Sequence, residues 1–153
     1  MPGFKKPRIR FRLVELSDAA YISRWLAESL RQSPEWECQF LNLLLEEWHD
    51  TEKLARQTSW MAMAGTQRLF FLEIAGQEEI FLTAPKGILD HRETALAAWQ
   101  RSIAHLRSLG SLTSLRVSID RTRHTECECL LDLGFTEITA NGFHNQRSFL
   151  LRL

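Results

Sequence analysis

The chain has 153 residues, a length at which one domain buries roughly two thirds of its unfolded surface. Hydrophobic residues make up 44% and charged residues 25%, which excludes a disordered, collagen-like or low-complexity chain. Nineteen basic residues balance nineteen acidic ones, so no net charge draws the protein to nucleic acid or to an anionic membrane. We therefore expect a single domain over residues 1–153 whose partners include neither.

Targeting signals and cysteines point to the same compartment. The opening MPGFKKPRIRF is basic but no apolar run follows it, and no stretch of about 18 apolar residues occurs. We expect a cytoplasmic protein without a signal peptide or a spanning helix. Cys38, Cys127 and Cys129 form an odd set without a CxxC pair, which favours reduced thiols over disulfides or structural zinc. The sequence thus predicts no metal.

The first third of the chain predicts one strand and two helices. Alternation over Ile9–Leu16 is typical of a half-buried strand. Ser17 and Asp18 are both good N-caps, and the apolar spacing after them predicts a helix over about 18–32. Ser33 followed by Pro34 then marks the start of a second helix, because proline is favoured in the first helical turn.

The middle of the chain changes to a period of two. Short apolar segments separated by glycine turns predict an antiparallel meander over Trp60–Ala64, Leu69–Ala75 and Glu79–Thr83. A helix follows and ends near Leu109, with Gly110 as its left-handed cap.

The last third predicts a strand, a short helix and a hairpin. These lie at Leu115–Ile119, at Thr125–Leu133, and at Phe135–Ala140 with Phe143–Leu151 around the Asn-Gly turn. The order of elements indicates an α+β domain, with a mixed, mostly antiparallel sheet flanked by helices.

Two segments resemble a known family. The opening IRFRLVELSDAAYISRWL is similar to the first strand, turn and helix of the GNAT superfamily of acyl-CoA-dependent N-acyltransferases. The segment SLRVSIDRTRHTECECLLDLGFTEI is similar to its fifth strand, following helix and Gly-Phe strand entry. The resemblance implies a GNAT-like acyltransferase fold, acetyl-CoA or another acyl-CoA as donor, and an amine of a small molecule or peptide as acceptor.

In that family a Q/R-x-x-G-x-G/A loop before a helix binds the CoA diphosphate, since backbone N–H groups at a helix start attract anions. The best match here is RETALA at 92–97, which has alanine where the family has its first glycine. Alanine keeps the N–H donor but lacks the backbone freedom of glycine. The resemblance implies cofactor contacts from Ile88, Leu89, Arg92, Glu93, Thr94, Ala95, Leu96, Ala97 and Arg123.

Asp90 offers a different interpretation of the same segment. It precedes Glu93 by three residues, the spacing of a capping box, so its carboxylate could accept the N–H groups that a diphosphate needs. The segment DHRETALA would then be a well-capped surface helix, and the carboxylate would repel phosphate. The sequence leaves both interpretations open.

The family's segment N-x-x-A/S-x-x-L-Y-x-x-x-G-F carries a tyrosine that usually protonates the leaving thiolate. Counted back from the Gly-Phe pair, the asparagine position falls on Arg123 and the tyrosine position on Leu130. Tyr21, the one tyrosine of the chain, lies in the first expected helix. The usual acid is therefore absent. Cys127 and Cys129 are expected to pack as small hydrophobic residues, with either thiol a candidate substitute.

Acyl transfer to an amine also needs a base or a water chain. Many family members carry a water-linked glutamate on the fourth strand, where this chain has Glu78 and Glu79. We name Glu79 as the catalytic base, on the strand face opposite Ile80 and Leu82. The alternative is a solvent-exposed carboxylate just after the turn, as is common for glutamate.

Residues 15–56 hold nine acids and four bases. The resemblance implies that the two helices of this region wall the acceptor site, where acidic residues would attract a cationic amine. A solvated acidic helix face explains the same pattern. Trp36 or Trp48 could line the acceptor pocket or a homodimer contact.

Two functions from different classes follow. The first is an N-acyltransferase, most simply an acetyltransferase, that uses acyl-CoA. The second is a GNAT-like module that has lost catalysis and acts as a binding or regulatory protein, as the residues Asp90, Ala95, Arg123 and Leu130 suggest.

Overall fold

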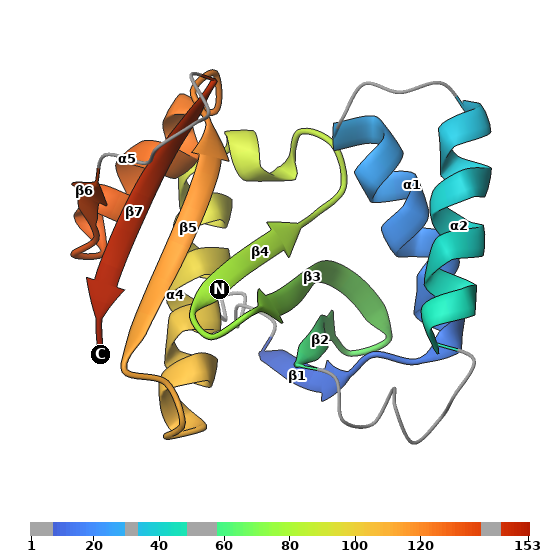
Figure 1. Ribbon diagram of the computed structural model, residues 1–153, viewed down its shortest axis with the longest axis horizontal. Helices are drawn as coiled ribbons and strands as arrows, with labels where there is room; N and C mark the ends of the chain where they lie inside the picture. The colour runs from blue at the N-terminus through green and yellow to red at the C-terminus, as the bar shows by residue number, and fades with distance from the viewer. Residues whose placement is uncertain (1–7, 30–33, 49–57, 139–144) are drawn as a thin grey trace, which may run out of the picture.

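The computed structural model describes residues 8–29, 34–48, 58–138 and 145–153 of the chain. Within them, seven strands form one sheet in the order β1-β2-β3-β4-β5-β7-β6 (Figure 1). The strands are β1 (Ile9–Leu13), β2 (Ser59–Ala64), β3 (Gln67–Ala75), β4 (Glu79–Thr83), β5 (Ser114–Asp120), β6 (Thr136–Ile138) and β7 (Gln146–Arg152). All neighbouring pairs are antiparallel except β4 and β5, which confirms the expected mixed sheet.

Four α-helices and two short 3-10 turns, η1 and η2, complete the described fold. The helices are α1 (Ala19–Ser29), α2 (Pro34–Trp48), α4 (Arg92–Ser108) and α5 (His124–Asp132), and the turns are η1 (Leu16–Asp18) and η2 (Ile88–Asp90). The second helix begins at Pro34 as predicted. Residues 30–33 and 139–144, which include the expected end of the first helix and the Asn-Gly turn, lie outside the described residues.

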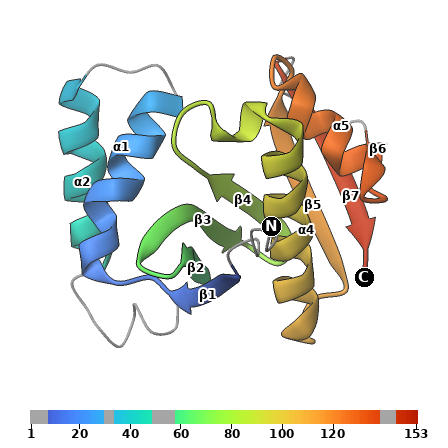
Figure 2. The ribbon, with the colours of Figure 1, turned by 180° about the vertical axis from the view of Figure 1, so that it is seen from behind.

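Two hydrophobic cores hold the helices to opposite faces of the sheet (Figure 2). On one face, α4 and α5 pack on the strands around the fully buried Trp99, Leu106 and Phe149. On the other face, α1 and α2 pack on β2 and β3 around Ile22 and Trp48. The buried positions of α4 recur at helical spacing, so its apolar face is what fixes it on the sheet.

Asp18 differs from its predicted role as a helix N-cap. It ends η1, its side chain is fully buried, and α1 begins one residue later. Its carboxylate accepts hydrogen bonds from Arg12 at 2.7 and 2.8 Å, from Arg68 at 2.7 Å and from the backbone N–H of Glu15 at 2.8 Å. Burial alone would raise the pKa of Asp18, but these donors lower it. The prediction failed because Arg12 of β1 and Arg68 of β3 bind the carboxylate, which points to the sheet and not to the start of α1.

His105 lies in an aromatic pocket between α4 and the sheet. Its ring stacks on Phe11 at 4.4 Å between centroids and meets the ring of Trp60 at 4.9 Å. Its Nε2 atom is buried without a hydrogen-bond partner among the described residues. Burial lowers the pKa of this imidazole, so the folded protein favours the neutral ring.

We expect the free energy of unfolding to fall as the pH drops below about 6.5, because the unfolded imidazole then binds a proton that the folded one resists. Urea unfolding at a series of pH values measures this dependence. The pH dependence below about 6.5 should be weaker in His105→Phe. His124→Phe, which replaces an exposed histidine, should show the same pH dependence as the wild type. An identical pH dependence in the wild type and His105→Phe would contradict the assignment.

Candidate functional site

A cleft opens where the two parallel strands separate. β4 and β5 share a single register pair, Glu79 with Arg116, and then diverge toward their carboxyl ends (Figure 1). The space between them is a cavity of about 620 Å³ with Trp99 of α4 among its lining residues. Side chains from both faces of the two strands reach it, so it penetrates the sheet rather than lying on it.

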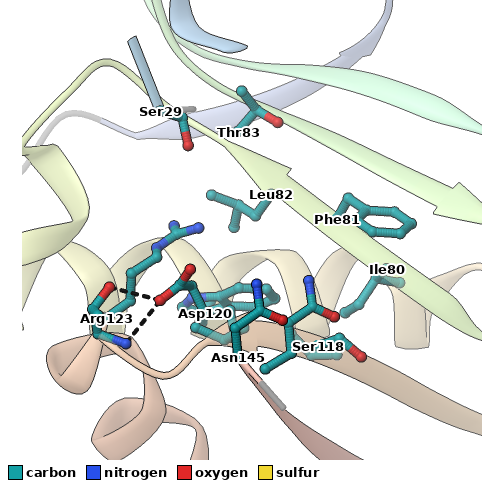
Figure 3. Close-up of a pocket in the computed structure, with 14 residues that line it drawn as sticks. Ser29, Ile80, Phe81, Leu82, Thr83, Ser118, Asp120, Arg123 and Asn145 are labelled. Atoms are coloured by element: carbon teal, nitrogen blue, oxygen red, sulfur yellow. Dashed lines mark hydrogen bonds between the residues drawn. The ribbon is translucent and has the colours of Figure 1, made fainter. Parts of the chain in front are cut away.

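The cavity has a polar end at the tips of the strands. Figure 3 shows Ser29, Thr83, Asp120, Arg123 and Asn145 around it, contributed by α1, β4, β5, the start of α5 and the segment before β7. Between the strands the lining is mostly apolar, with Ile80, Leu82, Val117 and Ile119, and it also includes Ser118. An elongated ligand with an apolar or amide-bearing middle and a polar end fits such a lining.

A second cavity of about 150 Å³ continues the cleft toward the loop before α4. It shares four residues with the first cavity, namely Ser29, Leu82, Thr83 and Arg123. Its remaining lining includes residues 84–87, Leu89 and Asp90. The cleft therefore runs from the separated strands to the segment that the sequence singled out as an anion loop.

The start of α4 is not capped by Asp90. The N-cap residue is His91, and it makes no side-chain cap hydrogen bond. Asp90 ends the preceding η2 turn, where its backbone N–H donates to the carbonyl of Gly87. His91 has an extended backbone, φ −90° and ψ 120°, which separates η2 from α4. The capping-box interpretation is therefore wrong, and no described side chain caps this helix.

The predicted cofactor residues separate into two groups. Leu89 and Arg123 line the second cavity, and Ile88 lies beside Leu89 in η2 with an exposed side chain. Glu93 and Thr94 are exposed in the first turn of α4. Of the predicted cofactor residues, only Leu89 and Arg123 line either cavity. Ile88, Glu93 and Thr94 do not, and neither do the fully buried Ala95 or the half-buried Leu96 and Ala97 further along α4.

Arg92 points to α5 instead of into the cleft. Its guanidinium forms ion pairs with Asp132 and, at 3.8 Å, with Glu128. These acids raise the pKa of Arg92, the hydrogen bond to Asp132 most of all. The family motif could not reveal this pairing, because both acids follow about 40 residues later in the chain.

Arg123 stands where the two cavities meet. Its side chain extends between β4 and β5 toward Leu82 and Ser29 in Figure 3. The same guanidinium forms an ion pair with the buried carboxylate of Glu126, one turn further along α5. The Nε1 atom of Trp99 donates a hydrogen bond to that carboxylate at 3.1 Å. Sequence analysis missed Glu126, whose position in an apolar helix face was its only signal.

No tyrosine lines either cavity among the described residues. Leu130, at the family's tyrosine position, is fully buried in the core. Cys127 and Cys129 are also fully buried, and burial raises the pKa of both thiols. These positions pack the core, as expected for free cysteines.

Glu79 begins β4 at the closed end of the cleft. It lies on the same strand face as Phe81 and Thr83, which line the large cavity, but is itself outside that lining. The neighbouring Glu78 binds Ser114 and pairs with Arg116 at 3.3 Å. Glu79 therefore directly precedes Ile80, the first residue of β4 that lines the large cavity.

Among the described residues that line the large cavity, Asp120 is the acidic one. Sequence analysis did not identify it. Asp120 ends β5, and its Oδ1 accepts two hydrogen bonds from Thr122, one from the backbone N–H at 2.9 Å and one from the side-chain hydroxyl at 2.6 Å. Its position at the carboxyl end of a strand beside a topological crossover was a usable signal.

Among the described residues of the two acidic helices, Glu28 is the carboxylate that lines the cleft. Glu28 of α1 lines the second cavity and accepts the backbone N–H of Lys86 at 3.3 Å. Trp48 is buried in the core, and Trp36 lies exposed beside Phe40, so neither lines the two cavities.

The described residues contain neither a candidate membrane span nor a candidate metal site. None of their helices is long and apolar enough to cross a membrane. They also hold no group of three or more histidine, cysteine or acidic residues that could bind a metal ion.

Known structures share this architecture, although no family model and no curated protein matches the sequence. A spermidine N-acetyltransferase chimera, partly from Vibrio cholerae, superposes with a TM-score of 0.70 at 11% identity over 94% of this chain and 95% of that one. An aminoglycoside acetyltransferase in complex with coenzyme A gives 0.67 at 14% identity over 95% of each chain. A Salmonella typhimurium structure with its cofactor acetyl-CoA gives 0.61 at 13% identity, over 95% and 94%. The chain therefore has the GNAT acetyltransferase fold.

Burial of two thiols predicts an unequal reactivity of the three cysteines. Cys38 of α2 is exposed, whereas Cys127 and Cys129 are buried with raised pKa values, so they form little thiolate. A thiol reagent should label only Cys38 rapidly in the native protein, and all three after unfolding. Mass spectrometry of the labelled peptides locates the modification. Rapid labelling of Cys127 or Cys129 would place that thiol in the cleft instead.

Proposed function

We propose that this GNAT-fold protein is an N-acyltransferase, most simply an acetyltransferase, that moves an acyl group from acyl-CoA to an amine of a small molecule or peptide. The observation that carries the proposal is the continuous cleft from the separated β4 and β5 to the uncapped start of α4. The fold neighbours that contain coenzyme A or acetyl-CoA support it.

The separated strands suit the pantetheine arm of CoA. β4 pairs with β3 along its whole length but with β5 only at Glu79. Alternate residues of β4 beyond Glu79 therefore direct backbone N–H and C=O groups toward β5 with no strand to meet them. An arm with two amide groups can pair with such an edge as an added strand does.

The loop before α4 suits the diphosphate. The helix start carries partial positive charge and N–H groups that no described side chain caps. Lys86 and Arg123 of the second cavity add positive charge, whereas Asp90 and Glu28 oppose it. The fit is thus partial: the backbone donors and Arg123 favour an anion, and Asp90 lowers the affinity.

The polar end of the large cavity suits the acceptor amine. The carboxylate of Asp120 can attract a cationic acceptor as it enters the cleft. Glu79, at the closed end of the cleft, remains our proposed base and would take the proton of the reacting amine through water. In the reaction the amine nitrogen forms a bond to the acyl carbon, and the carbon–sulfur bond breaks. The amine loses a proton to the base, and the thiolate leaves. With Leu130 in the tyrosine position, no described tyrosine supplies a proton to that thiolate.

A binding or regulatory module without catalysis is the second candidate. It is favoured by the buried Leu130 and by the ion pairs that hold Arg92 on α5. Absence of any binding of CoA or acetyl-CoA would select this candidate over the enzyme.

The first test is calorimetric titration with CoA and acetyl-CoA. The wild type should bind both, and Arg123→Gln should weaken binding about tenfold, the effect of one charge-assisted hydrogen bond. Arg101→Gln, an exposed change on α4, is the matched control and should bind as the wild type does. Equal affinity in Arg123→Gln and the control would remove Arg123 from the site.

A second test uses the carboxylate beside the helix start. Asp90→Asn removes a negative charge from the second cavity, so CoA should bind about two- to threefold more tightly, as expected for a charge near a helix terminus. The same titration measures the change, and it should shrink at high salt. Unchanged or weaker binding would show that the diphosphate does not lie near Asp90.

A further inference from the structure

Glu126 is a buried carboxylate that the proposed reaction does not use. It lies in the first turn of α5, is 1% exposed, and lines neither cavity. A carboxylate removed from water needs hydrogen bonds and a countercharge to stay ionised. Here Trp99 donates to Oε1 at 3.1 Å, and Arg123 forms the ion pair with Oε2.

Arg123 is the cation that faces Glu126. The other polar groups around it are the indole of Trp99 on α4, Asp90 of η2, and the thiols of Cys127 and Cys129 on α5. Burial raises the pKa of Glu126 above its usual value, Arg123 and Trp99 lower it without offsetting the burial, and Asp90 raises it slightly further. The ionised state of Glu126 thus depends on keeping Arg123 close.

Arg123 also faces the cleft. It lines both cavities, and its guanidinium extends into the space between β4 and β5 in Figure 3. One guanidinium therefore stands between a buried carboxylate and the place proposed for a diphosphate. A ligand phosphate attracts Arg123 and repels Glu126, and both effects favour a neutral Glu126.

We propose that Glu126 is a positioning residue that shares Arg123 with the ligand: it holds the guanidinium at the junction of the two cavities, and it takes up a proton when a diphosphate engages Arg123. The proposal rests on the proposed CoA site. The proton comes from solvent and adds to Oε2, while Oε1 continues to accept the N–H of Trp99. No net charge is then left unpaired in the core.

Linkage gives the sign of the pH effect. If ligand binding favours the protonated carboxyl, then protonation favours ligand binding to the same extent. Affinity for the diphosphate should therefore rise as the pH is lowered through the pKa of Glu126. A purely structural Glu126 would not couple affinity to proton uptake.

The test is calorimetric titration of the full chain with dephospho-CoA, at about neutral pH, in buffers of different ionisation enthalpy. This probe keeps the diphosphate and lacks the ribose phosphate, which itself titrates near neutrality. The dependence of the heat on the buffer counts the protons exchanged. We expect the wild type to take up a measurable fraction of one proton, up to one, per ligand bound.

Glu126→Gln keeps the shape of the side chain and its contact with Trp99, and it should bind the ligand with no proton uptake. Glu128→Gln removes an exposed carboxylate two residues away on α5 and should take up protons as the wild type does. Infrared difference spectra should show a new protonated carboxyl band when the ligand is added to the wild type. This measurement does not need a variant, so the test stays decisive if Glu126→Gln does not fold.

The outcomes separate the two proposals. Binding without proton uptake in the wild type, or with equal uptake in Glu126→Gln, overturns the role of Glu126 and leaves the CoA site standing. If neither the wild type nor either variant binds the ligand, both the CoA site and the role of Glu126 are overturned.

Discussion

The separation of β4 from β5 is the constraint on which the site depends. Every other neighbouring pair in the sheet runs over three or more residues, whereas this one has a single register pair at Glu79 and Arg116. An open strand edge inside a sheet is costly, because its backbone donors and acceptors have no partners. A fold that keeps such a gap must hold it open from outside and offer its polar groups to something else.

The two hydrophobic cores do the holding. α4 lies behind both strands with Trp99 at the base of the gap, and the core on the opposite face attaches α1 and α2 to β2 and β3. Beyond the pair of Glu79 and Arg116, β4 and β5 therefore stay unpaired, with the large cavity between them. In the same arrangement the cleft extends to the uncapped start of α4, and Arg123 lies where the two cavities meet.

Local pattern was sufficient to predict most of the fold. The meander of β2, β3 and β4 follows from alternation and glycine turns, and Pro34 marks the start of α2 because of proline's own backbone restriction. Local pattern failed where a distant partner decides the outcome. Aspartate is a residue type that favours the N-cap position, but the carboxylate of Asp18 binds two arginines of the sheet.

The candidate site was less predictable for the same reason. Leu89 and Arg123 were found through a motif, yet the motif could not show that Arg92 pairs with α5 or that His91 replaces Asp90 at the helix start. Asp120 had only its place at the end of a strand to mark it, and Glu126 became a candidate only once the strands and helices were placed together. Residues that converge on a cleft from several distant elements leave little trace in the linear sequence.

A crystal structure of the protein grown with CoA tests the central claim most directly. The account predicts pantetheine between β4 and β5, with its amides bonded to the β4 edge and the diphosphate over the start of α4 beside Arg123. Density for CoA elsewhere, or closed strands with no ligand at saturating CoA, would contradict it.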